Sequence, residues 1–290
     1  MARFEIVTES TCDLTAQLIR ELDVRVIPME FTVEGRAFSD NVFDRKLEPP
    51  EFYNLLREGK TASTAQVNST TYLDLIEPLL KQGKDVLILA FSSQLSGTYQ
   101  SSVMAVQQLK EQYPERKIIT IDTKSASMGE GLVVYYAAKL RDSGRSIDEV
   151  AEWVTENRLK VCHWFTVDDL NHLKRGGRLT ATKAIVGTFL GIKPVLHVDD
   201  EGKLKPVGKV RGRRQSLDAL IENMKKTYID TEPQTVFISH ADCIEDAEYL
   251  EKQVKANFKP ERVIINYIGP VIGAHAGPGT VAVFFLGKHR

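Results

Sequence analysis

An almost wholly apolar run, Asp85 to Phe91, constrains the fold of this chain more than any other feature. A strand with one solvated face alternates polar and apolar side chains, whereas a strand covered on both faces reads as a continuous apolar run. Strand-like runs also occur at Arg3–Thr8 and Lys117–Asp122, with helical patterns between them. Strands that alternate with helices are typical of a parallel sheet. The first half is therefore predicted to be α/β, with a doubly wound, mostly parallel sheet.

Other elements expected in the first half are a second strand, at Arg25–Val33, and six helices. The apolar spacing of Leu14, Leu18, Ile19 and Leu22 indicates a helix that begins near Asp13. The other helices are predicted at Pro49–Arg57, Thr71–Lys81, Gly97–Gln112, Glu130–Arg141 and Ile147–Asn157.

The second half mixes hairpins with helices, which predicts an α+β domain. A β-hairpin is expected where Ile192–Val198 and Lys203–Val210 flank a polar turn. Further strands are predicted at Val161–Val167, Thr235–Ser239, Arg262–Tyr267 and Thr280–Leu286, and helices at Asp168–Leu173, Thr180–Leu190, Ser216–Thr227 and Glu245–Asn257. The predicted boundary near residues 157–161 divides the chain into domains 1–158 and 159–290.

Composition excludes several classes of function. Lys and Arg number 38 against 39 Asp and Glu, so the chain lacks the basic excess of a general nucleic-acid binder. Its longest apolar runs, such as Val281–Leu286, are far shorter than the ~20 residues of a membrane span. The start of the sequence lacks the apolar core of a signal peptide, and three scattered cysteines form no metal-binding motif. We expect a cytoplasmic protein with reduced thiols, no bound metal and no nucleic-acid partner.

Hydroxyl-rich segments follow three of the predicted strands. They are Glu9–Thr11, Ser92–Thr98 and Thr123–Ser127, and a fourth, Thr61–Gln66, is a predicted loop before a helix. Ligands of open α/β sheets bind at the carboxyl ends of the strands, where hydroxyls and helix N-terminal amides favour an anion. No phosphate-binding loop occurs, so the pattern predicts a site for a single carboxylate. The simpler alternative is that each Ser or Thr only caps a helix.

His275 lies in a Gly- and Pro-rich segment, Gly269–Gly279, that is predicted to be a loop. Its glycines permit backbone conformations that bring the imidazole close to a ligand, although a purely structural histidine is the alternative. The remaining histidines, which show no metal-ligand spacing, are assigned to structure: His163, His172, His197, His240 and His289.

A cluster of basic residues also lies in the second half. Its members are Lys174, Arg175, Arg178, Lys183, Lys209, Arg211, Arg213 and Arg214. The cluster predicts a docking surface for an acidic protein, a phosphate or an anionic membrane. A solvated face is the alternative.

Several of these segments, in this order, resemble the DegV family, whose members are the fatty-acid-binding subunits of bacterial fatty acid kinase. The segments are Ser92–Ser101, Asp122–Gly131, Gly176–Arg178, Ile192–Leu196 and Gly269–Gly279, and the resemblance covers essentially the whole chain. It implies two α/β domains with a tunnel between them that buries one long-chain fatty acid, such as palmitate, without a cofactor. It also implies a carrier rather than an enzyme, which presents the acid to a separate kinase subunit. That subunit makes acyl phosphate for phospholipid metabolism.

The resemblance assigns the carboxylate contacts to Thr64, Ser96, Ser93 and His275. The loop match is loose, because Ala65 and Val67 stand where Ser and Pro are frequent, so Ser63 or Thr61 is an alternative donor to Thr64. Glu9 replaces the Asp of the family's opening motif and is given no role.

The acid needs only one compensating charge. Arg175, Arg178, Arg211 and Arg213, with Arg214, are therefore predicted to contact the kinase subunit or, transiently, an anionic membrane.

A serine hydrolase of acyl substrates is the competing hypothesis. Ser93 or Ser96 would be its nucleophile, with His275 as the base and Asp122 or Asp168 as the third member. The surroundings are not those of a GxSxG nucleophile turn.

Overall fold

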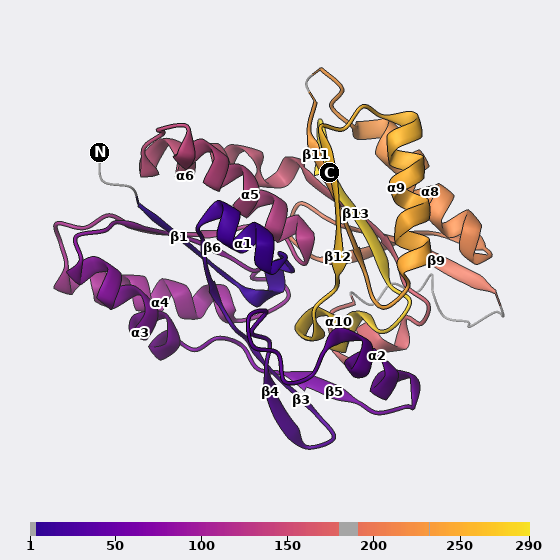
Figure 1. Cartoon of the computed structure of the whole chain (residues 1–290), viewed down its shortest axis with the longest axis horizontal. Helices are drawn as coiled ribbons and strands as arrows, with labels where there is room; N and C mark the ends of the chain where they lie inside the picture. The colour runs from indigo at the N-terminus through magenta and orange to yellow at the C-terminus, as the bar shows by residue number, and fades with distance from the viewer. Residues whose placement is uncertain (1–3, 180–190, 232) are drawn as a thin grey trace.

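Two β-sheets lie side by side in the computed structural model, which describes residues 4–179, 191–231 and 233–290 (Figure 1). The first sheet has the order β2-β1-β6-β7, and all its neighbours are parallel. Its strands are β1 (Glu5–Glu9), β2 (Arg25–Ile27), β6 (Val86–Ala90) and β7 (Ile118–Asp122). Because β2 and β6 lie on opposite sides of β1, the chain reverses its winding direction there, as in doubly wound folds.

The apolar run Asp85–Phe91 forms the central strand β6, which is buried on both faces. Val86 and Ile88 belong to one hydrophobic core, and Leu87 and Leu89 to another. The first core includes residues of α3 (Ser69–Lys81) and α4 (Thr98–Gln112); the second includes residues of α1 (Ala16–Leu22), α5 (Met128–Asp142) and α6 (Ile147–Asn157). The doubly wound α/β fold is therefore confirmed.

The single strand predicted at Arg25–Val33 is wrong, because Pro28 divides it. Proline lacks the N–H that a central strand must donate. Before it β2 joins the parallel sheet, and after it β3 (Glu30–Val33) starts a separate antiparallel sheet. This small sheet has the order β4-β3-β5, with β4 (Arg36–Ser39) and β5 (Ala62–Thr64). Thr64 accordingly lies on a strand, not in the predicted loop.

The second sheet has the order β10-β9-β8-β13-β11-β12 and is antiparallel except between β11 and β12. Its strands are β8 (Val161–Thr166), β9 (Ile192–Val198), β10 (Leu204–Arg211), β11 (Thr235–His240), β12 (Arg262–Tyr267) and β13 (Val281–Leu286). Helices α8 (Arg213–Thr227) and α9 (Ile244–Asn257) cover one face, and α5 contacts the other. The expected hairpin and the mixed α/β character of this half are present.

Three further predictions concern the segments around the sheets. The helix predicted at Asp168–Leu173 lies slightly later, as α7 (Asn171–Arg175). The helix predicted at Thr180–Leu190, including Lys183, lies outside the described residues. The predicted division at residue 158 falls at the short turn Arg158–Lys160 between α6 and β8, but one core contains Leu87 of the first sheet and Phe165 of the second. The division into two domains stays a prediction.

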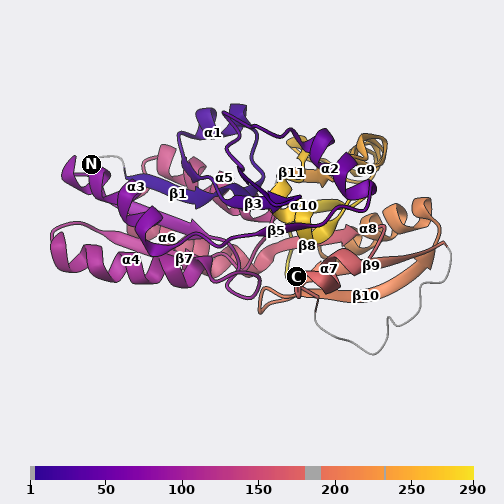
Figure 2. The same ribbon diagram turned by 90° about the horizontal axis from the view of Figure 1, so that it is seen from below.

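The predicted loop at Gly269–Gly279 is wrong for most of its length, because Pro270–Ala276 forms helix α10. Pro270 occupies the first helical turn, where its missing N–H costs nothing. Gly277 and Gly279, with φ of 79° and 74°, turn the chain back into β13. Figure 2 shows α10 beside β3 and β5, which brings the small sheet against the second half of the chain. Within the described residues, no helix has the length and hydropathy needed to cross a membrane.

Two helices and one turn complete the description. Helix α2 (Pro49–Arg57) matches its predicted range, and its N-terminus carries a capping box between Glu48 and Glu51. A 3-10 turn, Ser10–Cys12, follows β1. The helix predicted from Asp13 begins at Ala16 instead, where the side chain of Thr15 caps its N-terminus.

Three carboxyl groups, those of Glu9, Asp13 and Glu130, are buried next to this turn. Asp13 accepts hydrogen bonds from the Ser127 hydroxyl and, at 2.9 Å, from the amide of Gly269, so it joins the two halves of the chain. Burial raises the pKa of all three groups, and that of Asp13 reaches about 8, with a further contribution from Asp40. These groups therefore hold protons in the folded state at pH values where the unfolded chain has released them.

We expect the free energy of unfolding to fall as the pH rises from about 7 to 8, because the folded state binds more protons there and the buried histidines, whose pKa values burial lowers, are mostly neutral in both states. Asp13→Asn keeps the acceptor for Gly269 and is tolerated at the positive φ of 49°. It should make the decline shallower by about 1 kcal/mol per pH unit. Urea unfolding across a pH series measures this, with Asp44→Asn, at an exposed aspartate, as the control. An unchanged slope in Asp13→Asn would contradict the assignment.

Candidate ligand-binding site

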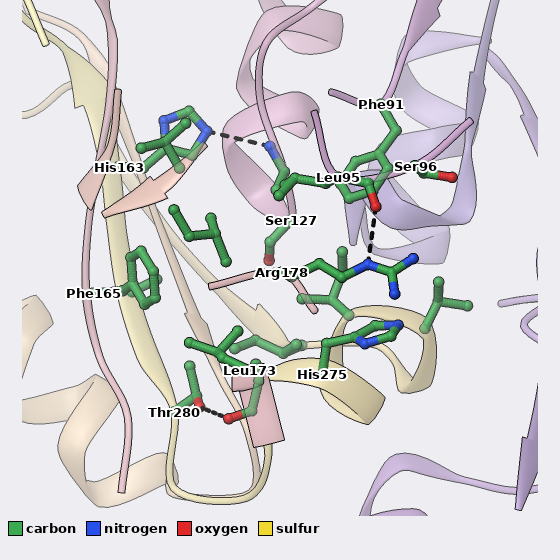
Figure 3. Close-up of a pocket in the computed structure, with 18 of the residues that line it drawn as sticks. Phe91, Leu95, Ser96, Ser127, His163, Phe165, Leu173, Arg178, His275 and Thr280 are labelled. Carbon is green, nitrogen blue, oxygen red and sulfur yellow. Dashed lines mark hydrogen bonds between the residues drawn. The ribbon is translucent and has the colours of Figure 1, made fainter. Parts of the chain in front are cut away.

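A cavity of about 220 Å³ lies between the halves of the chain (Figure 3). Its walls are mostly apolar and come from the first sheet's loops, from the second sheet and from α10. Representative side chains are Phe91 and Leu95 after β6, Phe165 on β8, Val271 on α10 and Phe284 on β13. A cavity with this lining fits a long apolar ligand.

Polar side chains gather at one part of the cavity wall. The Thr64 hydroxyl on β5 and Nε2 of His275 on α10 are 2.8 Å apart and hydrogen-bonded. Ser96, before α4, lines the same cavity, and its hydroxyl is 2.9 Å from that of Thr98. The structure therefore brings together three of the four predicted site residues: Thr64, Ser96 and His275.

Ser93 is not among the cavity-lining residues. Its hydroxyl accepts a hydrogen bond from Nζ of Lys124 at 3.2 Å, and its amide donates to Asp122. The prediction that Ser93 contacts the ligand is therefore not supported by its position. The segment Thr61–Thr64 offered three alternative donors, and the structure separates them. Thr64 lines the cavity, whereas Thr61 and Ser63 line only neighbouring pockets.

His275 is neutral in this setting. Burial, with the nearby Arg178 guanidinium as a second cause, lowers its pKa to about 4. Its Nδ1 atom is buried and has no hydrogen-bond partner within the described residues. At neutral pH His275 can thus donate one hydrogen bond but adds no charge to the site.

Arg178 supplies the charge, and its predicted contact with a partner stays a prediction. Its side chain lines the cavity, Nε donates to the carbonyl of Leu95 at 3.0 Å, and Nη1 donates to the carbonyl of Gly176. The ion pairs of the described residues include none with Arg178. Two backbone carbonyls thus fix a guanidinium beside Ser96 and His275, with its charge uncompensated (Figure 3).

A second, polar pocket adjoins this end of the cavity, and we call it the vestibule. Its lining includes the exposed residues Lys60, Ser63 and Arg175. Thr64, Arg178 and His275 line both the cavity and the vestibule, and we call these three residues the gate. A ligand group held at the gate therefore faces the apolar cavity on one side and a polar surface pocket on the other.

Two glycines allow the close packing around the gate. A Cβ atom at Gly176 would lie 2.2 Å from Nδ1 of His275, and one at Gly97 would lie 2.2 Å from Oε1 of Gln66. Neither distance is possible between non-bonded atoms. The Gly-containing segments therefore let α7 approach α10 and let Gln66 lie over the start of α4.

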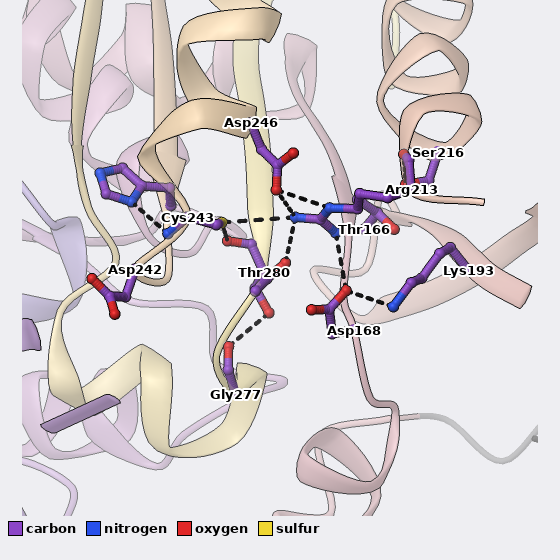
Figure 4. A network of polar contacts seen from close by, with 12 residues as sticks. Thr166, Asp168, Lys193, Arg213, Ser216, Asp242, Cys243, Asp246, Gly277 and Thr280 are labelled. Atoms are coloured by element: carbon purple, nitrogen blue, oxygen red, sulfur yellow. Dashed lines mark hydrogen bonds and ion pairs between the residues drawn. The ribbon is translucent and has the colours of Figure 1, made fainter. Parts of the chain in front are cut away.

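The predicted docking cluster divides in the structure. Arg213 is bound internally: it pairs with Asp246 at 2.8 Å and with Asp168 at 3.4 Å, and it donates to the carbonyl of Gly279 at 2.6 Å (Figure 4). These bonds tie α8 to α9 and to the turn before β13, so the position of Arg213 does not support its predicted contact with a partner. Arg175, Arg211 and Arg214 are exposed, and Arg214 lies over the ring of Tyr249.

The serine, histidine and aspartate that the hydrolase hypothesis requires are not hydrogen-bonded to one another. A nucleophile and its base must be within hydrogen-bond reach of each other, but His275 bonds to Thr64, and Ser96 to Thr98. Asp122 pairs with Lys124, and Asp168 pairs with Lys193 and Arg213. No described carboxylate bonds to Nδ1 of His275. The geometry gives no support to a triad of these residues.

Sequence reasoning missed three other residues of the cavity wall. Ser127, in one of the hydroxyl clusters, lines the cavity together with Ser239 at the end of β11. His163, assigned to structure, also lines it, with Nδ1 hydrogen-bonded to the carbonyl of Val161 at 2.9 Å. The sequence does carry a signal for Ser239, because this polar residue ends a predicted apolar strand, where ligands of such sheets bind.

Comparisons with known proteins agree over the whole chain. Residues 3–288 match the model of the DegV family, described as uncharacterised protein. A DegV domain-containing protein of Clostridium perfringens is 46% identical over 290 residues, which cover 100% of this chain and 99% of that protein.

Solved structures are similar as well. A DegV family protein from Thermus thermophilus, described by its fatty acid binding, has a TM-score of 0.87 at 29% identity, with 97% and 98% of the two chains covered. A fatty acid binding DegV family protein from Streptococcus agalactiae has a TM-score of 0.84 at 29% identity, with 100% of both chains covered. The match to the family model and the 46% identity to a relative together show that this chain belongs to the DegV family.

Proposed function

We propose that this protein binds one long-chain fatty acid in the cavity, with the carboxylate at the gate and the acyl chain among the apolar side chains. The observation that carries the proposal is the composition of the cavity wall. Among the described residues of the cavity wall, the guanidinium of Arg178 has no ion-pair partner and stands beside the neutral donors Thr64, Ser96 and His275, and apolar side chains form most of the remainder.

Charge balance favours a carboxylate over a more highly charged group. A carboxylate carries one negative charge, which Arg178 alone compensates. Hydroxyls and a neutral imidazole complete its hydrogen bonds without adding charge. Hydrogen bonds to a charged group contribute about 1.5–3 kcal/mol each, so a few such contacts suffice to fix the orientation of the ligand. The fatty acids bound by the relatives from Thermus and Streptococcus have this chemistry.

We further propose that the protein is a carrier, which presents the acid through the vestibule to a separate kinase subunit in the cytoplasm. The chain has no phosphate-binding loop of its own, and the vestibule gives access to the gate from the protein surface. A kinase subunit that holds ATP would form acyl phosphate there, for use in phospholipid synthesis. Both Arg175, which lines the vestibule, and Arg211 are exposed members of the predicted docking cluster.

The purified protein should contain about one equivalent of a fatty acid. Burial of ~14 methylenes at ~0.8 kcal/mol each gives a gross ~11 kcal/mol before the costs of association, so the ligand should survive purification. Native mass spectrometry and analysis of the extracted lipid measure this. Apo protein alone after mild handling, together with no uptake of added fatty acid, would overturn the proposed function.

Loss of the hydroxyls at the gate should weaken binding of the carboxylate. We expect Thr64→Val combined with Ser96→Ala to lower fatty acid affinity about tenfold or more, because each lost bond to a charged group contributes about 1.5–3 kcal/mol. Calorimetric titration of delipidated protein measures the change. Ser93→Ala is the matched control, since this serine lies outside the cavity lining. An equal loss in Ser93→Ala, or none in the double variant, would place the carboxylate elsewhere.

Charge reversal at Arg175 and Arg211 should reduce acyl phosphate formation by the kinase subunit without changing the bound lipid. Complementary charges accelerate encounter, and salt screens them, so the loss should be largest at low ionic strength. The measurement is a kinase assay on lipid-loaded protein across a salt series. The control reverses two exposed lysines on other helices, Lys110 and Lys252. Equal rates for the two double variants at every salt concentration would contradict docking at Arg175 and Arg211.

A further inference from the structure

The apolar wall of the cavity is interrupted by a pair of hydroxyl groups, those of Ser127 and Ser239. Both residues line the cavity and are buried, with exposures of 5% and 0%. In Figure 3, Ser127 lies between His163 and Phe165 on one side and Ser96 and Arg178 on the other, and its hydroxyl points into the cavity. The hydrogen bonds found for the two serines include none to the gate. The two serines therefore form a polar site that is separate from the gate, in a cavity wall that is mostly apolar.

The two hydroxyls belong to a chain of hydrogen bonds that begins at Asp13. The Ser127 hydroxyl donates to Oδ2 of Asp13 and lies 3.1 Å from the hydroxyl of Ser239. Asp13 itself is fixed by the amide of Gly269 at 2.9 Å. The hydroxyl of Ser127 is bonded to both Asp13 and Ser239. The hydroxyl of Ser239 is therefore the one that can still form a hydrogen bond to a ligand. The hydrogen-bonded chain therefore ends at Ser239, a residue of the cavity wall.

The backbone at Ser127 is strained. Its φ of 52° and ψ of −147° are a combination that glycine adopts freely and residues with a Cβ atom rarely adopt. Glycine would remove the strain, so the serine side chain must contribute something that offsets it. Its bond to Asp13 fixes the hydroxyl, and that hydroxyl in turn orients Ser239.

A plain methylene chain offers the hydroxyl of Ser239 no hydrogen bond beyond the one to Ser127. A ligand hydroxyl that is buried elsewhere against the apolar wall has no partner at all, which is costly. A ligand hydroxyl can both donate and accept a hydrogen bond. It therefore fits Ser239 whether the hydrogen bonds among Asp13, Ser127 and Ser239 run in one direction or in the other. A ligand keto group can only accept, so it fits only one of the two arrangements.

We propose that the Asp13–Ser127–Ser239 chain is a recognition site for a hydroxyl group part-way along the acyl chain, so that the cavity accepts monohydroxylated long-chain fatty acids. The proposal rests on the proposed function, since it requires an acyl chain in the cavity with its carboxylate at the gate. The gate then fixes one end of the ligand, and Ser239 selects the carbon that carries the hydroxyl.

The test is a positional series measured on delipidated full-length protein. Octadecanoic acid and its monohydroxy isomers, substituted at successive positions along the chain, are titrated by calorimetry. We expect one position, or two adjacent ones, to bind at least as tightly as octadecanoic acid. The other isomers should bind about tenfold more weakly or worse, because their hydroxyl is buried without a partner. This series needs no variant protein.

Ser239→Ala then identifies the residue responsible. In this variant, the affinity for the favoured isomer relative to that for octadecanoic acid should fall about tenfold below the wild-type ratio. Ser102→Ala is the matched control, because Ser102 is a buried serine whose hydroxyl bonds to Tyr99 and Thr120 and does not line the cavity.

Each outcome decides the proposal. Hydroxy isomers that are all weaker than octadecanoic acid by a similar factor would overturn it, as expected if a resident water molecule satisfies Ser239. A favoured isomer that Ser239→Ala and Ser102→Ala weaken equally would also overturn it. If octadecanoic acid itself fails to bind, the proposed function fails and this inference falls with it, which is a distinct result.

Discussion

The packing of α5 against both sheets is the constraint on which the rest of the structure depends. Its glycines make this possible: a Cβ atom at Gly129 would lie 2.1 Å from Nε2 of His163, and one at Gly131 would lie 2.6 Å from the carbonyl of Cys12. The helix can therefore contact the second sheet on one side and the turn after β1 on the other. The same contact sets the position of Ser127, which precedes the helix and lines the cavity. The cavity wall and the shared core are thus consequences of one helix position.

Burial in the same region also determines which side chains are neutral and which are charged. Carboxyl groups and histidines both lose charge when they leave water, since desolvation disfavours the charged form. Burial accordingly raises the pKa of Glu9, Asp13 and Glu130 and lowers that of His275. A guanidinium is the side chain that keeps its positive charge most readily in proteins. Among the groups that line the cavity, Arg178 is therefore the one suited to hold a permanent positive charge.

The sequence predicted elements whose residues carry a strong local pattern. The apolar run of β6 and the range of α2 are examples, and both follow from burial or helix-start signals within a few residues. The small sheet of β3, β4 and β5 was not predicted, because its strands have three or four residues each and its stability comes from packing on α10. Arg178 and Arg213 are alike in sequence context, yet one lines the cavity and the other is paired with carboxylates. Contacts with residues far away in the sequence give these two arginines their different roles, and a local sequence pattern does not predict such contacts.

In the proposed function, binding and presentation of the acid depend on the same residues, because the gate lines both pockets. If the gate residues lay deep in the cavity, the carboxylate would be held firmly but would be out of reach of a second protein. If they lay on the surface, the acyl chain would be only partly buried and the hydrophobic contribution would be lost. The contact between β5 and α10 avoids both outcomes, since it places Thr64 and His275 at the boundary between apolar wall and solvent-accessible pocket. In the proposed complex, a phosphoryl donor reaches the carboxylate through the vestibule while the acyl chain stays between the sheets.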